Sequence, residues 1–216
     1  MAGKFLSFEG GDAVGKSTQI RHLARWLEGE GASVLLAREP SDSPLGAALR
    51  RRMMHAPLPA PRLQALLFTA ARRQHIAETI APARARAQWV LCDRFCDSTF
   101  AYQGEEVALE VLQQWHRRFC RGFLPDCTIL LDAPSAVTMQ RLAARGKRRG
   151  FDARAEAWHS ALRQRFLALA RQSPRRFVCV DASVSEAATA RQIRRALQSR
   201  FRLGPKHARQ AATPRL

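Results

Sequence analysis

The sequence has little of what marks secreted, membrane-spanning or metal-centred proteins. Its 216 residues include five cysteines with no C-x-x-C pair, which argues against a disulfide framework and a zinc site. The six histidines contain no H-E-x-x-H arrangement, so a metal centre built from protein ligands is not expected. No run of about 18 apolar residues occurs, and the first residues lack the charged-then-apolar pattern of a secretory signal, so none is expected. We expect a cytoplasmic protein with no membrane partner.

Acidic residues are scarce as well. The chain has 18 Asp and Glu against 36 Lys and Arg, a formal net charge of +18. Such a field attracts nucleic acid and nucleotides alike. Much of the excess is arginine in predicted helices, as in RQIRRALQSRFR, where a solvated helix face accounts for it. Nucleic acid is therefore not expected as a specific ligand.

What the sequence does contain is a nucleotide-binding loop. The stretch FEGGDAVGKST, residues 8–18, meets the pattern G-x-x-x-x-G-K-[ST] between an apolar strand-like run and a helical pattern. Glycines let successive N–H groups face a phosphate at a helix N-terminus. Lys16 adds a mobile cation, and the Ser17 hydroxyl can ligate Mg²⁺. The predicted nucleotide-binding residues are Gly10, Gly11, Asp12, Ala13, Val14, Gly15, Lys16, Ser17 and Thr18.

Five strand-like runs alternate with helical patterns along the chain, at residues 4–9, 32–39, 88–94, 127–133 and 176–182. This alternation predicts one α/β domain, residues 1–203, whose parallel sheet is covered on both faces. Ligands of such sheets bind at the carboxyl ends of the strands, where charged residues follow each predicted strand. Residues 204–216 lack a core pattern and are predicted to be a disordered basic tail.

Further motifs resemble the thymidylate kinase family. REP, LGAALR, LLFTAARRQH, DRFCDSTFAYQG, LLDAPS, RLAARG and VDAS follow the loop in that family's order and approximate spacing, over about residues 4–201. The pattern DR-x(3)-ST-x-AYQG is far more specific than the nucleotide loop. The resemblance to the bacterial members implies a three-layer P-loop nucleoside monophosphate kinase fold with a five-stranded parallel sheet. It also implies phosphorylation of dTMP to dTDP by ATP with Mg²⁺, on a homodimer.

The resemblance also implies roles for residues that would hold dTMP. Arg94 and Arg50 match acceptor-phosphate clamps, a task that suits the guanidinium fork. Phe68 and Arg72 lie four residues apart on a predicted helix and match the residues that stack on thymine and donate to its O4. The other predicted acceptor-binding residues are Glu39, Pro40, Ser98, Tyr102 and Gln103, with Tyr102 at the place that a 2′-hydroxyl would need.

On the catalytic side, Asp12 matches an acidic residue near the 3′-hydroxyl and the metal, and Asp93 matches a carboxylate that orders metal-bound water. A cationic lid is predicted over about residues 145–153. The predicted catalytic residues are Lys16, Asp12, Arg94 and, from this lid, Arg149. Arg141 and Arg145 are predicted to bind ATP.

Plainer explanations exist for several of these residues: a surface arginine for Arg50, ordinary core for Phe68, a loop-stabilising residue for Asp12, a buried ion pair for Asp93 and a solvated charge run for the lid. The chain also departs from the family pattern. SDSP follows REP where Gly-Gly-Thr is usual, Ala13 replaces a glycine, and Gly150 stands where an arginine is expected.

Two alternative functions stay open at this stage. A kinase for another deoxynucleotide or for a deoxynucleoside would share the sheet and the loop, and a nucleoside kinase could use Glu9 or Glu39 as its general base. More remotely, the basic chain could be a nucleic-acid-binding P-loop ATPase.

Overall fold

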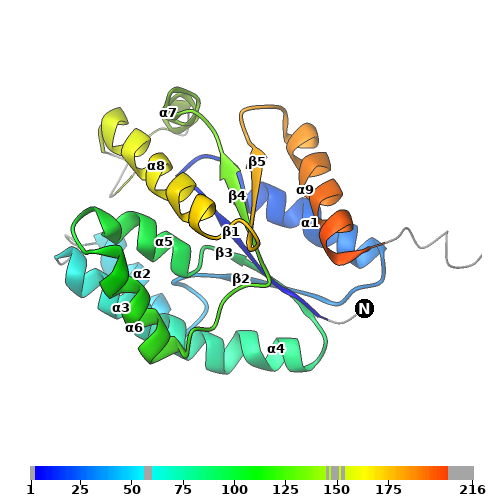
Figure 1. Ribbon diagram of the computed structural model, residues 1–216, viewed down its shortest axis with the longest axis horizontal. Coiled ribbons are helices and arrows are strands. Elements are labelled where there is room, and N and C mark those ends of the chain that lie inside the picture. The colour runs from blue at the N-terminus through cyan, green and yellow to red at the C-terminus, as the bar shows by residue number, and fades with distance from the viewer. Residues whose placement is uncertain (1–2, 56–59, 145, 147–150, 152–153, 204–216) are drawn as a thin grey trace, which may run out of the picture.

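A five-stranded parallel sheet forms the centre of the molecule in a computed structural model that describes residues 3–55 (without the Met54 side chain), 60–144, 146, 151 and 154–203. The strand order is β2-β3-β1-β4-β5, and all neighbours pair in parallel (Figure 1). The α/β prediction is confirmed. The strands are β1 (Phe5–Glu9), β2 (Val34–Arg38), β3 (Trp89–Asp93), β4 (Cys127–Asp132) and β5 (Phe177–Asp181).

Helices cover both faces of this sheet, which gives three layers (Figure 1). One face carries α1 (Lys16–Gly29) and α9 (Glu186–Phe201). Most of the remaining helices pack on or beside the other face. They are α2 (Pro44–His55), α3 (Pro61–His75), the π-helical turn η1 (Ile76–Ile80), α4 (Ala81–Ala85), α5 (Cys96–Tyr102), the 3₁₀ turn η2 (Gln103–Glu105), α6 (Leu109–Cys120), α7 (Ser135–Ala144) and α8 (Glu156–Gln172).

The central strand β1 shows why both faces must be covered. Leu6 and Phe8 point into the core beneath α1 and α9, whereas Phe5 points into the other core. All three side chains are fully buried, and burial of each stabilises the fold by roughly 1.5–3 kcal/mol. Alternation of side chains along a strand therefore fixes two apolar layers, one on each side of the sheet.

A buried ion pair ties α5 to the sheet. Asp97 is fully buried, and Arg176 donates to both of its carboxylate oxygens at 2.5 and 2.8 Å. Arg176 also donates to the Thr128 hydroxyl at 2.6 Å, and that hydroxyl lies 3.1 Å from the hydroxyl of Ser7. Residues of β1, β4 and α5 and the residue that precedes β5 thus share one polar cluster inside an otherwise apolar layer.

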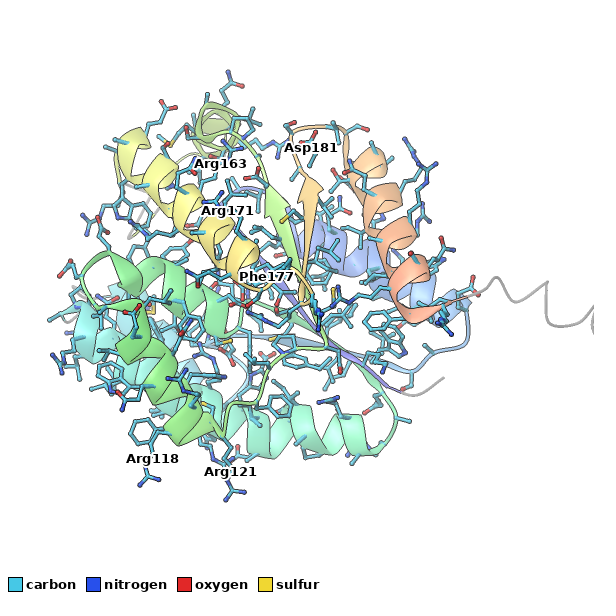
Figure 2. The ribbon with its side chains drawn as sticks, viewed as in Figure 1. Arg118, Arg121, Arg163, Arg171, Phe177 and Asp181 are labelled. Carbon is cyan, nitrogen blue, oxygen red and sulfur yellow. The ribbon has the colours of Figure 1, made fainter. Side chains whose placement is uncertain are left out.

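Several of the many arginines lie on the protein surface, at exposed positions of helices. Arg118 and Arg121 project from the end of α6, and Arg171 lies exposed at the end of α8 (Figure 2). Such positions are typical of a solvated helix face. In the part of the chain that the structure describes, no helix is both long and apolar enough to span a bilayer.

Asp97→Asn should lower the free energy of unfolding by about 3 kcal/mol, because it leaves the Arg176 guanidinium without its carboxylate. Asp126→Asn is the matched control, since the Arg84–Asp126 pair is more exposed and should contribute only about 1 kcal/mol or less. Urea denaturation of the three proteins measures both. Equal losses in the two variants would contradict the importance of the Asp97 pair.

Candidate functional site

The carboxyl ends of β1, β2 and β3 open into a cavity of about 490 Å³. All of the residues predicted to bind the acceptor line it, and so do Asp12, Ala13, Lys16, Ser17 and Asp93 from the predicted nucleotide and metal sites. These residues come from segments that are far apart in the sequence. The fold therefore brings the predicted acceptor and donor groups to one edge of the sheet.

The nucleotide loop connects β1 to α1 and has the left-handed backbone that its glycines permit. Gly10 has φ 126°, and a Cβ there would lie 2.5 Å from the carbonyl oxygen of Leu131. Ala13 keeps a positive φ of 60° although it is not glycine. The backbone at position 13 is therefore left-handed, as a glycine there would allow, although the residue is alanine.

Lys16 lies buried beneath this loop at the start of α1. Its Nζ donates to the carbonyl oxygens of Gly10 and Gly11 at 3.0 and 2.6 Å. Burial, together with repulsion from Arg94, lowers the pKa of Lys16 to about 8, against the attraction of Asp12, Asp93 and Glu9. Lys16 is therefore a cation at neutral pH that loses its proton in mildly alkaline solution.

Ser17 and Asp93 form the part of the site that suits a divalent cation. The Ser17 hydroxyl donates to Asp93 Oδ2 at 3.0 Å, and Arg38 forms an ion pair with the same oxygen at 3.1 Å. Asp93 Oδ1 is buried and has no hydrogen-bond partner among the described residues. No cluster of three or more His, Cys, Asp or Glu suited to a metal occurs within the described ranges. Oxygen donors of this kind fit Mg²⁺ that keeps water and phosphate ligands.

Arg94 occupies the turn from β3 to α5 with a φ of 72°. Its guanidinium donates to Asp12 at 2.5 Å, to the Ser98 hydroxyl at 3.1 Å and to the Gly10 carbonyl at 3.2 Å. It also lies over the ring of Tyr102, at 5.0 Å from the centroid. A half-buried guanidinium that these contacts fix next to the nucleotide loop is suited to a phosphate.

Asp12 accepts a second hydrogen bond, from the Tyr102 hydroxyl at 2.8 Å. Burial raises the pKa of Asp12, but Arg94 and Lys16 outweigh burial, so the net shift is downward. Asp12 is thus a carboxylate at neutral pH. Asp12 therefore does more than stabilise its own loop, because it also contacts the side chains of Arg94 and Tyr102.

The unusual SDSP segment shapes the start of α2. The Ser43 hydroxyl accepts from the Gly46 amide at 3.1 Å, as an N-cap residue does. Ser41 accepts from the predicted clamp Arg50 at 3.2 Å, and the Asp42 carboxylate accepts from the Arg38 amide. Arg50 lines the cavity while much of its side chain stays exposed. The replacements after Pro40 therefore support Arg50 and the helix that carries it.

Arg72 lies deep in the cavity wall and is 3% exposed. Its Nε donates to Glu39 at 2.7 Å, and its NH2 donates to the Thr99 hydroxyl at 2.9 Å and the Phe95 carbonyl at 3.3 Å. Its NH1 is buried without a hydrogen-bond partner among the described residues. The half-buried ring of Phe68, one helical turn earlier, also lines the cavity. A ligand with a hydrogen-bond acceptor can therefore satisfy Arg72.

Sequence reasoning missed several residues of the cavity wall. The ring of Phe151 lies 5.0 Å from that of Tyr102 and stacks on Trp158 at 5.5 Å. Gln103 was predicted, but its partner Gln64, at 3.1 Å, was not. A charge at a strand end was a signal for Arg38, the DRFCDSTFAYQG segment contains Phe95 and Thr99, and Phe151 falls within the predicted lid. Met53 had no local signal, because tertiary packing brings it to the cavity. The additional lining residues are Arg38, Met53, Phe95, Thr99 and Phe151.

Some predicted residues lie elsewhere. Arg141 donates to the Ala182 carbonyl at 2.9 Å and does not line the cavity. It lies beside the carboxyl end of β5, because Ala182 directly follows that strand. Arg145 and Arg149 fall outside the described residues, as do most of the predicted lid and all of residues 204–216.

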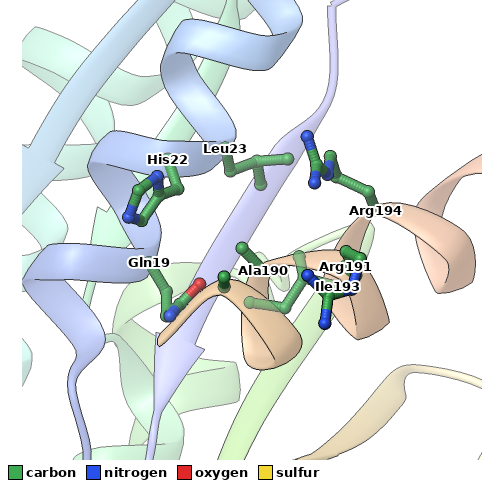
Figure 3. Close-up of a pocket in the computed structure, with 8 residues that line it drawn as sticks. Gln19, His22, Leu23, Ala190, Arg191, Ile193 and Arg194 are labelled. Atoms are coloured by element: carbon green, nitrogen blue, oxygen red, sulfur yellow. The ribbon is translucent and has the colours of Figure 1, made fainter. Parts of the chain in front are cut away.

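A second cavity, of about 240 Å³, lies between α1 and α9 (Figure 3). Leu23 and Ile193 are among its apolar lining residues, and His22, Arg191 and Arg194 contribute polar groups. None of the predicted site residues lines it. The cavity at the strand ends is therefore the candidate functional site.

Comparisons with known proteins agree with this geometry. A sequence model described as "Thymidylate kinase" matches residues 8–193. The chain is similar to the thymidylate kinase of Thiobacillus denitrificans, at 39% identity over 203 residues, which cover 92% of this chain and 98% of that protein. It is 41% identical to the thymidylate kinase of Bradyrhizobium sp. over 92% of this chain and 91% of that protein. It is 42% identical to the thymidylate kinase of Caulobacter vibrioides, over 83% of this chain and 88% of that protein.

The affinity of the site for Mg·ATP should fall as pH rises through about 8, because Lys16 is cationic below its pKa of about 8 and neutral above it. We expect the Kd to increase about tenfold or more between pH 7 and 9.5, since the cationic fraction of Lys16 falls about tenfold for each pH unit above its pKa. Calorimetry measures the Kd. Lys16→Arg stays charged and is the control; its Kd should be flat over this range, and equal slopes would refute the role of Lys16.

Proposed function

Because the chain belongs to the thymidylate kinase family, we propose that it transfers the γ-phosphate of ATP to dTMP, in the cavity at the ends of β1, β2 and β3. The observation that carries the choice of acceptor is the buried NH1 of Arg72, a donor without a partner among the described residues of a site that also presents Phe68. ATP is the co-substrate, and Mg²⁺ is the metal that the donor set supports.

Thymine fits this donor because its O4 accepts a hydrogen bond. Cytosine has an amino group at that position, so two donors would face one another in a desolvated site, at a cost of about 1–3 kcal/mol or more. Uracil keeps the O4 acceptor and lacks only the methyl group, which is worth about 1 kcal/mol. Glu39 and Thr99 hold Arg72 in place, so it cannot turn away to accommodate cytosine.

The transfer itself depends on positioned charge. Arg94 binds the acceptor phosphate, and Lys16 binds the terminal phosphates of ATP, so that two anions can approach one another. Asp12 accepts a hydrogen bond from the 3′-hydroxyl and keeps Arg94 in place. Ser17 and Asp93 would hold Mg²⁺, which neutralises phosphate charge when bound. Arg145 and Arg149 of the predicted lid add further positive charge in this proposal.

A nucleoside kinase would need a free general base. Both candidate bases, Glu39 and Glu9, already form hydrogen bonds or ion pairs with neighbouring residues. Glu39 is buried between Arg72 and His75, with contacts of 2.7 and 3.3 Å. Glu9 is fully buried and accepts hydrogen bonds from the Phe95 amide and the Ser98 hydroxyl. Neither carboxylate can approach a 5′-hydroxyl without breaking these contacts. A nucleic-acid ATPase is not favoured either, because the curated relatives are nucleotide kinases by name.

A homodimer is part of the proposal, formed through α3 and α6. These two helices pack side by side and expose Leu63, Leu66 and Phe119, which are 48%, 37% and 49% accessible. The half-buried ring of Trp115 on α6 lies 5.7 Å from the guanidinium of Arg62 on α3. Exposed apolar side chains grouped on adjacent helices are typical of a protein interface. A two-fold axis would place this face against itself.

The base preference is testable with dTMP, dCMP and dUMP in a coupled ADP-release assay. Wild type should prefer dTMP over dCMP by about tenfold to several hundredfold, and over dUMP by about five- to tenfold. Arg72→Ala should shrink the preference over dCMP and leave that over dUMP largely unchanged. Arg73→Ala, at the exposed neighbouring position, is the control. A wild type that uses dCMP as well as dTMP, or none of the three, overturns the proposal.

The dimer is testable by sedimentation velocity. Leu66→Glu and Phe119→Glu should each convert the protein to a monomer, because each places a charge within the apolar face. Leu36→Glu alters a residue of equal exposure, 49%, on the edge strand β2 and should leave a dimer intact. A wild-type monomer, or dimers in all variants, would refute this interface.

A further inference from the structure

Glu9 is a carboxyl group in an unfavourable place. It ends the central strand β1, is fully buried, and lies near the buried carboxylate of Asp97. Burial and the proximity of Asp97 raise its pKa, although Ser98, Arg94 and the Phe95 amide stabilise the carboxylate and act in the opposite direction. Such a group costs stability, so its contacts indicate what it contributes instead.

Both oxygens of Glu9 contact the turn that presents Arg94. The Phe95 amide donates to Oε1 at 2.7 Å, and the Ser98 hydroxyl donates to Oε2 at 2.6 Å. The Arg94 amide donates to the Phe8 carbonyl, adjacent to Glu9, at 3.0 Å. Arg94 has a positive φ, a conformation that non-glycine residues adopt only when their surroundings impose it. The end of β1 supplies those surroundings.

Ser98 connects Glu9 to the guanidinium itself. A hydroxyl has one hydrogen to donate and lone pairs that accept. Because the Ser98 hydrogen points to Glu9, its lone pairs are available to Arg94 NH1, which donates to Ser98 Oγ at 3.1 Å. Glu9 thus sets the direction of the Ser98 hydroxyl, and the Ser98 hydroxyl in turn holds the Arg94 guanidinium.

We propose that Glu9 is a positioning residue, which holds Arg94 through Ser98 and through the Phe95 amide in the orientation that binds the acceptor phosphate. Glu9 does not touch the substrate in this inference. The inference rests on the proposed function, since it takes Arg94 as the phosphate clamp.

The other end of the same strand provides a matched control. Asp126 accepts from the Phe5 amide at 2.7 Å, as Glu9 accepts from the Phe95 amide. Asp126 also pairs with Arg84 and does not line the strand-end cavity. Asp126→Asn therefore alters a carboxylate bound to a backbone amide without altering the acceptor site.

The experiment compares wild type with Glu9→Gln, Asp126→Asn, Ser98→Ala and the double variant Glu9→Gln/Ser98→Ala. Glu9→Gln should raise the KM for dTMP by about tenfold or more, since small misplacements of a positioning group have effects of that size. The KM for ATP should stay within twofold, and the Ki of thymidine, which lacks the phosphate, should not change. Asp126→Asn should leave all three constants within twofold.

The double variant tests the relay. If Glu9 acts through Ser98, the effect of Glu9→Gln on the KM for dTMP should be much smaller in the Ser98→Ala background. Independent, multiplicative effects would overturn the relay, and equal changes in the KM for dTMP, the KM for ATP and the Ki of thymidine would reduce Glu9 to a structural role. Glu9→Asp serves if Glu9→Gln does not fold, and should shift the same constants. Wild-type activity with dTMP tests the proposed function separately.

Discussion

The parallel pairing of β1 with β3 is the constraint on which the site depends. The register places Phe8 beside Asp93, so the nucleotide loop after β1 and the DRFCDSTFAYQG segment after β3 leave the sheet at the same level. The hydrogen bond from the Arg94 amide to the Phe8 carbonyl continues this pairing beyond the strand. Arg94 then comes close enough to Lys16 to lower the pKa of Lys16.

Around this pairing, the fold concentrates charge that an apolar core would reject. Arg94 is compensated by Asp12, Arg72 by Glu39, and Asp97 by Arg176. Buried pairs of this kind contribute little net stability, because desolvation offsets their attraction. What they provide is a fixed direction for each guanidinium. A phosphoryl transfer between two anions requires such fixed positive charge more than it requires a general base.

Two departures from the family pattern, the SDSP segment and Ala13, also have a structural explanation, whereas Gly150 lies outside the described residues. Ser43 caps α2 and Ser41 holds Arg50, so the SDSP segment supports the acceptor side through side chains. Gly46 is indispensable there, because a Cβ would lie 1.5 Å from the Pro40 carbonyl oxygen. Ala13 retains the loop conformation that glycine would adopt. These substitutions change how the site is supported and leave the predicted residues at the cavity.

The sequence by itself predicted the five strands, their parallel crossovers and most of the residues that line the cavity, because apolar periodicity and motif spacing are local signals. It predicted Arg72 as a base-reading residue from its position in a motif. Only the tertiary structure decided that Nε and NH2 of its guanidinium bind protein groups while NH1 has no partner among the described residues. The partners Glu39, Thr99 and the Phe95 carbonyl come from other elements. Phe151, Gln64 and the contacts of Glu9 were likewise decided by packing between distant segments. No local pattern encodes these contacts, because each depends on which side chains the sheet and its helices bring within hydrogen-bonding or van der Waals distance.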